Sequence, residues 1–219
     1  MVTANDREYK ATRLIKRGEA ALEPVLAQLA AWIAARWLVT VLNVIYDEID
    51  VHHKRPRLQV IVEHSREWRE FFDGPNFDTA KQQAIAARFA ELVNRQYPGR
   101  CDVDGLVVVF SAFAPMARQD ADSQIADVDI CDLRERIANP HLWTIHRCFG
   151  RVTFMFYTDE QVRTYAQAGR RQAYADLYFE LLQRHDEFGY LRRARFTVGF
   201  DSQENFDKNY AGNWFYYTR

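Results

Sequence analysis

The densest group of side chains with catalytic potential lies in YDEIDVHHKRPR, residues 46–57. Its carboxylates and imidazoles are the groups that bind divalent metals and carry out acid–base catalysis. The side chains concerned are Asp47, Asp50, His52 and His53. In a strand, Asp50 and His52 share a face, whereas the adjacent histidines point to opposite faces. The segment therefore has two interpretations: a solvated hairpin loop, or the site of a metal-assisted hydrolase or nuclease.

A second polar group is the acidic run in residues 116–141, the most polar part of the chain. Its five aspartates lack the glycine and the terminal glutamate of a calcium-binding loop, so no metal site is predicted there. One interpretation is a solvated loop. The other is an acidic surface that binds a basic protein, with Asp120, Asp122 and Asp127 as the binding candidates.

His146 and Cys148 alternate on one face of a predicted strand. A cysteine beside a histidine can act as a nucleophile, but the sequence shows no third member that would orient the pair. Buried core positions are therefore the favoured interpretation of both residues.

The segment 210–219 holds five aromatic side chains. We expect 213–219 to form a strand that inserts into a sheet and exposes large residues on both faces. Because tyrosine and tryptophan dominate protein interfaces, this segment is also a candidate binding surface. Its binding candidates are Trp214, Tyr216 and Tyr217.

Composition and the absence of known motifs limit the partners and cofactors that we expect. The chain has 219 residues, is 48% hydrophobic and carries a formal net charge of −1. Nucleic acid is an unexpected partner because proteins that neutralise phosphates usually have a basic excess. None of the glycine-rich nucleotide motifs, zinc motifs or hydrolase motifs is present, so no cofactor is predicted.

Three cysteines at spacings of 30 and 17 residues match no zinc pattern and indicate reduced thiols. The N-terminal segment has no apolar core of signal-peptide length. The longest apolar stretch, 26–45, contains Gln28 and Arg36, which favour a buried helix and strand over a membrane span. We therefore expect a cytoplasmic protein without membrane partners.

The hydrophobic period predicts helices and strands in alternation. Pro24, Ser65, Asp78, Asp201 and the Thr158–Gln161 pair are the expected helix starts. Predicted helices cover 5–22, 24–36, the segments after residues 65, 78 and 158, and a short one after 201; predicted strands cover 37–49, 57–64, 105–115, 142–149, 151–158, 193–200 and 213–219. The uninterrupted apolar run at 105–115 is expected in the centre of a sheet, and 116–141 is expected as a loop with a short helix at 133–138.

This order predicts an α+β fold of antiparallel or mixed sheets with packed helices. We expect residues 1–219 to form a single compact unit. The order also allows two related β-β-α-β halves, 37–115 and 142–219, preceded by N-terminal helices at 5–36.

Residues 142–219 resemble small α+β domains of bacterial proteins of unknown function, including ribonuclease-inhibitor-like and toxin-immunity proteins. The resemblance rests on a strand ending in Phe-Tyr before a helix, GRVTFMFYTDEQV, and on the aspartate- and aromatic-containing end, FDSQENFDKNYAGNWFYYTR. It implies a protein that works by binding another protein, such as an immunity or inhibitor protein, and no catalytic residue carries over. A homodimer whose C-terminal strands pair across a two-fold axis is a further alternative.

Overall fold

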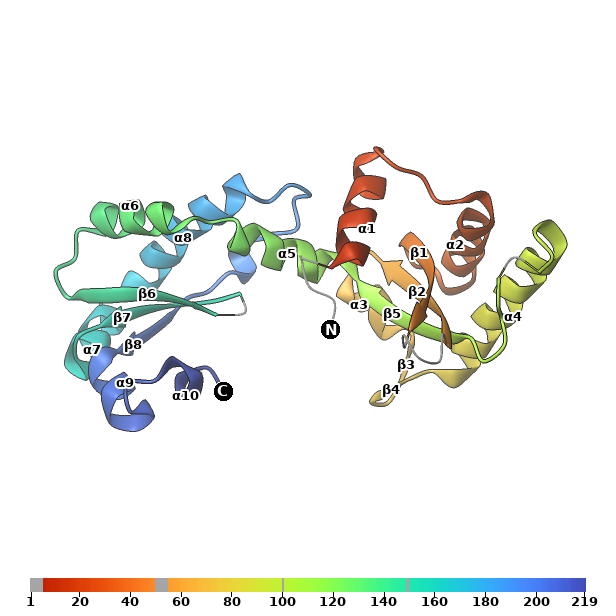
Figure 1. Cartoon of the computed structure of the whole chain (residues 1–219). Coiled ribbons are helices and arrows are strands. Elements are labelled where there is room, and N and C mark those ends of the chain that lie inside the picture. The colour runs from red at the N-terminus through yellow and green to blue at the C-terminus, as the bar shows by residue number, and fades with distance from the viewer. Residues whose placement is uncertain (1–5, 50–54, 100, 149) are drawn as a thin grey trace. The chain divides into compact units, whose positions relative to one another are not determined.

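The computed structural model describes residues 6–49, 55–99, 101–148 and 150–219. It confirms an α+β fold with small mixed sheets (Figure 1). The chain divides into two compact units, Met1–Met116 and Ala117–Arg219, whereas the sequence analysis expects a single one. Helix α5, Phe113–Ser123, spans the boundary.

The first unit is built on a three-stranded sheet in the order β1-β2-β5. Strands β1 (Val41–Ile49) and β2 (Arg55–Val62) form the predicted antiparallel hairpin, in which Asp47 lies opposite Arg57. Strand β5 (Val107–Ala112) pairs with β2 in parallel. Its expected central position is wrong: β2 is central. The β5 carbonyls of Phe110 and Val108 accept hydrogen bonds from the side chains of Trp68 and Gln82 instead.

Helices cover both faces of this sheet. Helices α2 (Pro24–Trp37) and α4 (Thr79–Gln96) bury leucine, valine and phenylalanine side chains against one face. Helix α1 (Arg7–Arg17) lies against β1, and its buried Thr12 accepts a 3.0 Å hydrogen bond from the side chain of Asn43. Helix α3 (Ser65–Arg69) and the short pair β3 (Phe72–Asp73) and β4 (Asn76–Phe77) connect β2 to α4.

The second unit repeats this topology with the sheet order β6-β7-β8. Strands β6 (Leu142–Cys148) and β7 (Arg151–Phe156) are antiparallel as predicted, and β8 (Gly199–Ser202) pairs with β7 in parallel. The remaining elements are α6 (Asp127–Ile137), α7 (Asp159–Gln167), α8 (Arg170–Arg184), the 3-10 turn η1 (Arg193–Arg195), α9 (Gln203–Tyr210) and α10 (Trp214–Tyr217). Helix α8 packs tyrosine, phenylalanine and leucine side chains on one face of the sheet.

The expected loop at 116–141 is mostly helical, in α5 and α6. Two of its aspartates, Asp127 and Asp129, lie in the first turn of α6. The Asp129 carboxylate accepts a 3.0 Å hydrogen bond from the backbone N–H of Ala126. Acidic side chains stabilise a helix N-terminus, so these polar residues favour a helix start here over a solvated loop.

The expected C-terminal strand is also wrong, because 214–217 form helix α10. The side-chain oxygen of Asn213 accepts a 2.9 Å hydrogen bond from the N–H of Phe215 and starts this turn. Helical geometry turns the four consecutive aromatic side chains in different directions, where a strand would place them alternately on two faces. The sheet therefore ends at β8 in the described part of the chain.

Three predicted helix starts are confirmed. Pro24 occupies the first turn of α2, the Asp78 side chain accepts from the N–H of Lys81, and Thr158 and Gln161 form a capping box. The other two were misplaced by one residue, since the caps are His64 and Ser202.

None of the helices in the described ranges is both long and apolar enough to cross a membrane.

Leu38 ends α2 in the left-handed conformation, with φ 55°, and its side chain is 91% exposed. Glycine adopts this conformation without steric cost. We expect Leu38→Gly to raise the free energy of unfolding by about 1 kcal/mol, measured by urea denaturation. Ala138→Gly, at the equivalent end of α6 with φ 48°, should act in the same direction. A loss of stability in both variants would contradict this interpretation.

Candidate functional site

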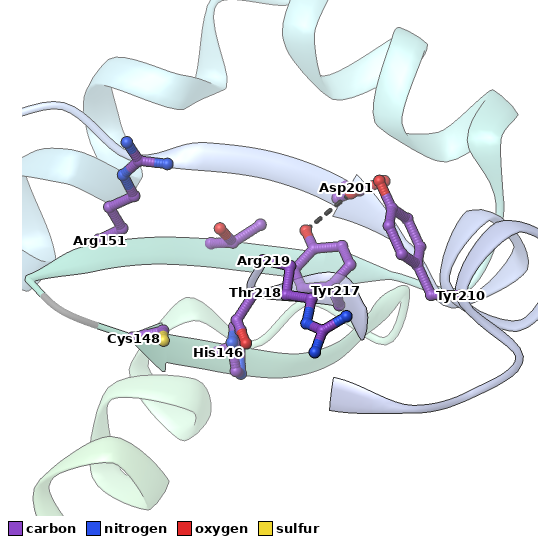
Figure 2. Close-up of a pocket in the computed structure, with 9 residues that line it drawn as sticks. His146, Cys148, Arg151, Asp201, Tyr210, Tyr217, Thr218 and Arg219 are labelled. Atoms are coloured by element: carbon purple, nitrogen blue, oxygen red, sulfur yellow. Dashed lines mark hydrogen bonds between the residues drawn. The ribbon is translucent and has the colours of Figure 1, made fainter. Parts of the chain in front are cut away.

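The candidate site is a pocket of about 760 Å³ on the second face of the C-terminal sheet (Figure 2). Strands β6, β7 and β8 form its floor, and the segment from α9 to the chain end forms its wall. It is lined by His146, Cys148, Arg151, Thr153, Asp201, Tyr210, Tyr217, Thr218 and Arg219.

Strand alternation separates this pocket from the core. Val152 and Phe154 of β7 point toward α8 and are buried there, so Arg151 and Thr153 point to the opposite face. In the register of the sheet, Thr153 lies beside His146 on one side and Gly199 on the other. A Cβ on residue 199 would approach the Thr153 hydroxyl oxygen to 3.0 Å, so glycine keeps this part of the floor open.

Asp201 fixes the wall of the pocket to its floor. One carboxylate oxygen accepts hydrogen bonds of 2.8 Å from the backbone N–H of Ser202 and from the side chain of Asn205. The other accepts a 2.7 Å hydrogen bond from the hydroxyl of Tyr217. Burial and the neighbouring Asp201 carboxylate raise the pKa of Tyr217, so its phenol remains a neutral donor.

Trp214 covers the histidine of the floor. Its ring stacks on the His146 imidazole with centroids 4.1 Å apart and planes at 10°, and Tyr217 meets the same imidazole edge-on. Phe206 of α9 also packs against the Trp214 ring, with the two ring centroids 4.1 Å apart. Burial lowers the pKa of His146, and within the described residues its Nε2 atom is buried without a hydrogen-bond partner. The imidazole is therefore neutral at neutral pH.

Arg151 and Arg219 bring positive charge to the pocket. The Arg219 guanidinium lies 4.2 Å from the centroid of the Phe215 ring. Within the described ranges, neither arginine forms an ion pair with an acidic side chain. Because Asp201 is already hydrogen-bonded, the open part of the pocket can accept an anionic group.

The predicted metal cluster can be followed only at Asp47, because Asp50, His52 and His53 lie outside the described residues. The Asp47 carboxylate accepts two hydrogen bonds from Arg57, at 2.8 and 2.6 Å. Among the residues that the structure describes, no three histidine, cysteine or acidic side chains are grouped to hold a metal ion.

The three aspartates predicted to bind a partner have different environments. Asp122 accepts a 2.7 Å hydrogen bond from the buried Tyr178, which gives it a structural contact. Asp120, in α5, accepts a hydrogen bond from the side chain of Gln124, which directly follows that helix. Asp127 is fully exposed at the start of α6, 3.6 Å from Arg147.

The predicted aromatic residues do come together, on α10. Tyr217 points inward to Asp201, whereas Trp214 and Tyr216 are 36% and 53% exposed. His146 and Cys148 are half-buried and line the pocket. Arg151 and Asp201 were not predicted as site residues from the sequence. The alternation in RVTFMF, which sets Arg151 and Thr153 opposite the buried Val152 and Phe154, was the signal available for the first of them.

No family model, curated protein or solved structure matches this chain.

Tyr217→Phe removes the hydroxyl that binds Asp201 and keeps the ring. A hydrogen bond to a carboxylate contributes more than a neutral one, so we expect a loss of about 1–3 kcal/mol in the free energy of unfolding by urea denaturation. Tyr216→Phe, which alters an exposed phenol on the same helix, should change stability by less than about 0.5 kcal/mol. Equal effects of the two substitutions would show that the Asp201 contact does not anchor the segment.

The lowered pKa of His146 makes stability depend on pH. Below pH 6.5, the ordinary pKa of histidine, the unfolded chain binds a proton that the folded chain does not. Stability should therefore fall as the pH is lowered from 8 to 5. Urea denaturation at pH 8 and at pH 5 should show a smaller loss of stability for His146→Gln than for the parent chain. His185→Gln leaves His146 intact and should show the same loss of stability between pH 8 and pH 5 as the parent chain. If His146→Gln lost as much stability as the parent chain, His146 would not be the group that causes the pH dependence.

Proposed function

We propose that the protein is a non-catalytic binding module that recognises another protein through α10. One observation supports this most directly: Trp214, Phe215 and Tyr216 are consecutive and are 36%, 59% and 53% exposed. We call these three side chains the aromatic patch. Tryptophan and tyrosine offer large contact areas with few rotatable bonds, which is why they contribute strongly to protein interfaces.

The patch is held in place before any partner binds. Asn213 caps the helix, Trp214 stacks on His146, and the neighbouring Tyr217 binds Asp201. Side chains that are already ordered lose less conformational entropy on association. A rigid patch therefore suits a binding surface better than a mobile aromatic tail would.

The chemistry of the pocket supports binding over catalysis. The raised pKa of Tyr217 keeps its phenol protonated, so no phenolate is available as a base at neutral pH, and the half-buried imidazole of His146 is stacked against the rings of Trp214 and Tyr217. These groups can donate hydrogen bonds and pack, which a binding site needs. The alternative, a metal-assisted hydrolase or nuclease, depends on Asp50, His52 and His53, and its described carboxylate, Asp47, is engaged by Arg57.

Within this proposal, an immunity or inhibitor protein of the bacterial cytoplasm is the class that we favour. Such a protein acts by covering a toxin or an enzyme, and it needs a preformed surface but no cofactor. Cys101, Cys131 and Cys148 form no disulfide with one another, which supports a reducing compartment. A homodimer that uses the same patch is the alternative partner.

The proposal can be tested with a photo-crosslinking amino acid at position 215 of the full chain, expressed in the native host. We expect one discrete crosslinked species, identified by mass spectrometry as another protein or as a second copy of this chain. The matched control places the same amino acid at Val128, a residue of the same unit that is 63% exposed. Absence of a crosslink at 215, or the same products at both positions, would overturn the proposal.

A further inference from the structure

The two sheets can be compared residue by residue because their strands pair in the same order and direction. The backbone hydrogen bonds at the ends of the strands also correspond in the two units. In the first unit, Glu63 N–H donates to Thr40 and its carbonyl accepts from Ala114. In the second unit, Tyr157 N–H donates to His141 and its carbonyl accepts from Glu204. The residue equivalent to a given position therefore follows from the register.

By this register, Arg151 of β7 is equivalent to Arg57 of β2. Each arginine faces the first strand of its hairpin: Asp47 lies opposite Arg57, and Cys148 lies opposite Arg151. Two residues further on, on the same face, Thr153 takes the place of Gln59. The arginine is common to both units, whereas the acidic partner is present only in the first.

Arg57 shows what this position binds in the first unit. Its guanidinium donates to both oxygens of Asp47 and lies 3.5 Å from the carboxylate of Glu8, which α1 supplies. Gln59 donates to the same two carboxylates, each at 3.1 Å. The bonded Asp47 raises the pKa of Arg57. The outer face of this sheet is thus an internal carboxylate-binding site that the chain fills itself.

In the second unit the corresponding space is the pocket. Cys148 has no carboxylate to offer the opposite Arg151, and Arg151 is exposed, whereas Glu8 of α1 lies against Arg57. The acidic side chain of the pocket, Asp201, already accepts three hydrogen bonds, from Ser202, Asn205 and Tyr217. The exposed Arg151 therefore lacks the carboxylate that its counterpart holds, and Arg219 adds a second positive charge.

We propose that this pocket binds a carboxylate of an acidic side chain on the partner protein. This inference rests on the proposed function and adds the chemistry that the partner must present beside the aromatic patch. The Arg151 guanidinium supplies the fork of N–H donors that matches a carboxylate, as Arg57 does for Asp47. The partner carboxylate occupies the space that Asp47 and Glu8 fill in the first unit.

The direct test is an NMR titration of the isotope-labelled full chain, following the side-chain Nε–Hε signal of Arg151. The probe is an acetylated and amidated heptapeptide in which glutamate alternates with glycine, and the comparison peptide has glutamine in place of glutamate. We expect a saturable shift with the glutamate peptide and none with the glutamine peptide. Arg151→Gln should weaken binding, followed by backbone shifts, by roughly tenfold or more. Arg163→Gln, an exposed arginine of α7, should leave it unchanged.

A second variant restores the first unit's ion pair without removing the arginine. Cys148→Asp places a carboxylate opposite Arg151, as Asp47 stands opposite Arg57. It should abolish peptide binding, whereas Cys148→Ser should retain it. Because Cys148→Asp adds an attractive cross-strand pair, it should fold at least as well as the parent chain.

The outcomes separate this inference from the proposed function. A crosslink at position 215 without peptide binding at Arg151 would overturn the carboxylate site and leave the binding module in place. Binding of inorganic phosphate, with no binding of the glutamate peptide, would also overturn it, because the site would then select a different anion. Peptide binding that Cys148→Asp and Arg151→Gln both remove would support it.

Discussion

A three-stranded sheet has two faces, and each must be covered if its side chains are to leave water. In the C-terminal unit, α8 covers one face with a continuous apolar core. The second face depends on a short chain segment that the hydrogen bond from Tyr217 to Asp201 ties to the sheet. The packing of Trp214 on His146, the exposure of the aromatic patch and the pocket beside it all follow from where that contact places α10.

The position of Asp201 explains why one residue can do this. It is in β8, directly before the Ser202 cap that starts α9, so its carboxylate receives a backbone N–H and a side-chain amide from the start of that helix. The chain then passes through α9 and reverses, which returns Tyr217 to the same carboxylate. Because the segment covers only part of the face, the floor around Arg151 and Thr153 stays open. In the N-terminal unit the longer helix α1 supplies Glu8, which contacts Arg57 and Gln59 at this place.

Local signals in the sequence predicted the parts of this fold that local chemistry decides. The two hairpins follow from β-branched and alternating segments, and the capping box at Thr158 and Gln161 from two residues that satisfy each other's backbone partners. The C-terminal segment was predicted as a strand because its aromatic residues favour strands by propensity. Its helical turn depends on the Asn213 cap and on a carboxylate sixteen positions earlier, which no local pattern reveals.

Local signals in the sequence also allowed part of the candidate site to be predicted. Trp214, Tyr216 and Tyr217 could be recognised from composition, since large aromatics near a chain end need a structural or binding role. The alternation in RVTFMF could place Arg151 on the face opposite the core, but its role could not be assigned from the sequence, because that role comes from the comparison with Arg57 and from the exchange of Asp47 for Cys148. That comparison requires the register of two sheets, which is a property of the tertiary fold.

Hydroxyl-radical footprinting inside cells of the native host would test the central claim, that the aromatic patch is a protein-binding surface, most directly. The rates of oxidation at Trp214, Phe215 and Tyr216 would be compared with those in the purified chain, with exposed Leu14 of the N-terminal unit as the internal reference. A binding surface predicts that the patch is protected in the cell and reactive in the purified chain, while Leu14 reacts equally in both. Equal reactivity of the patch in the two settings would contradict the claim.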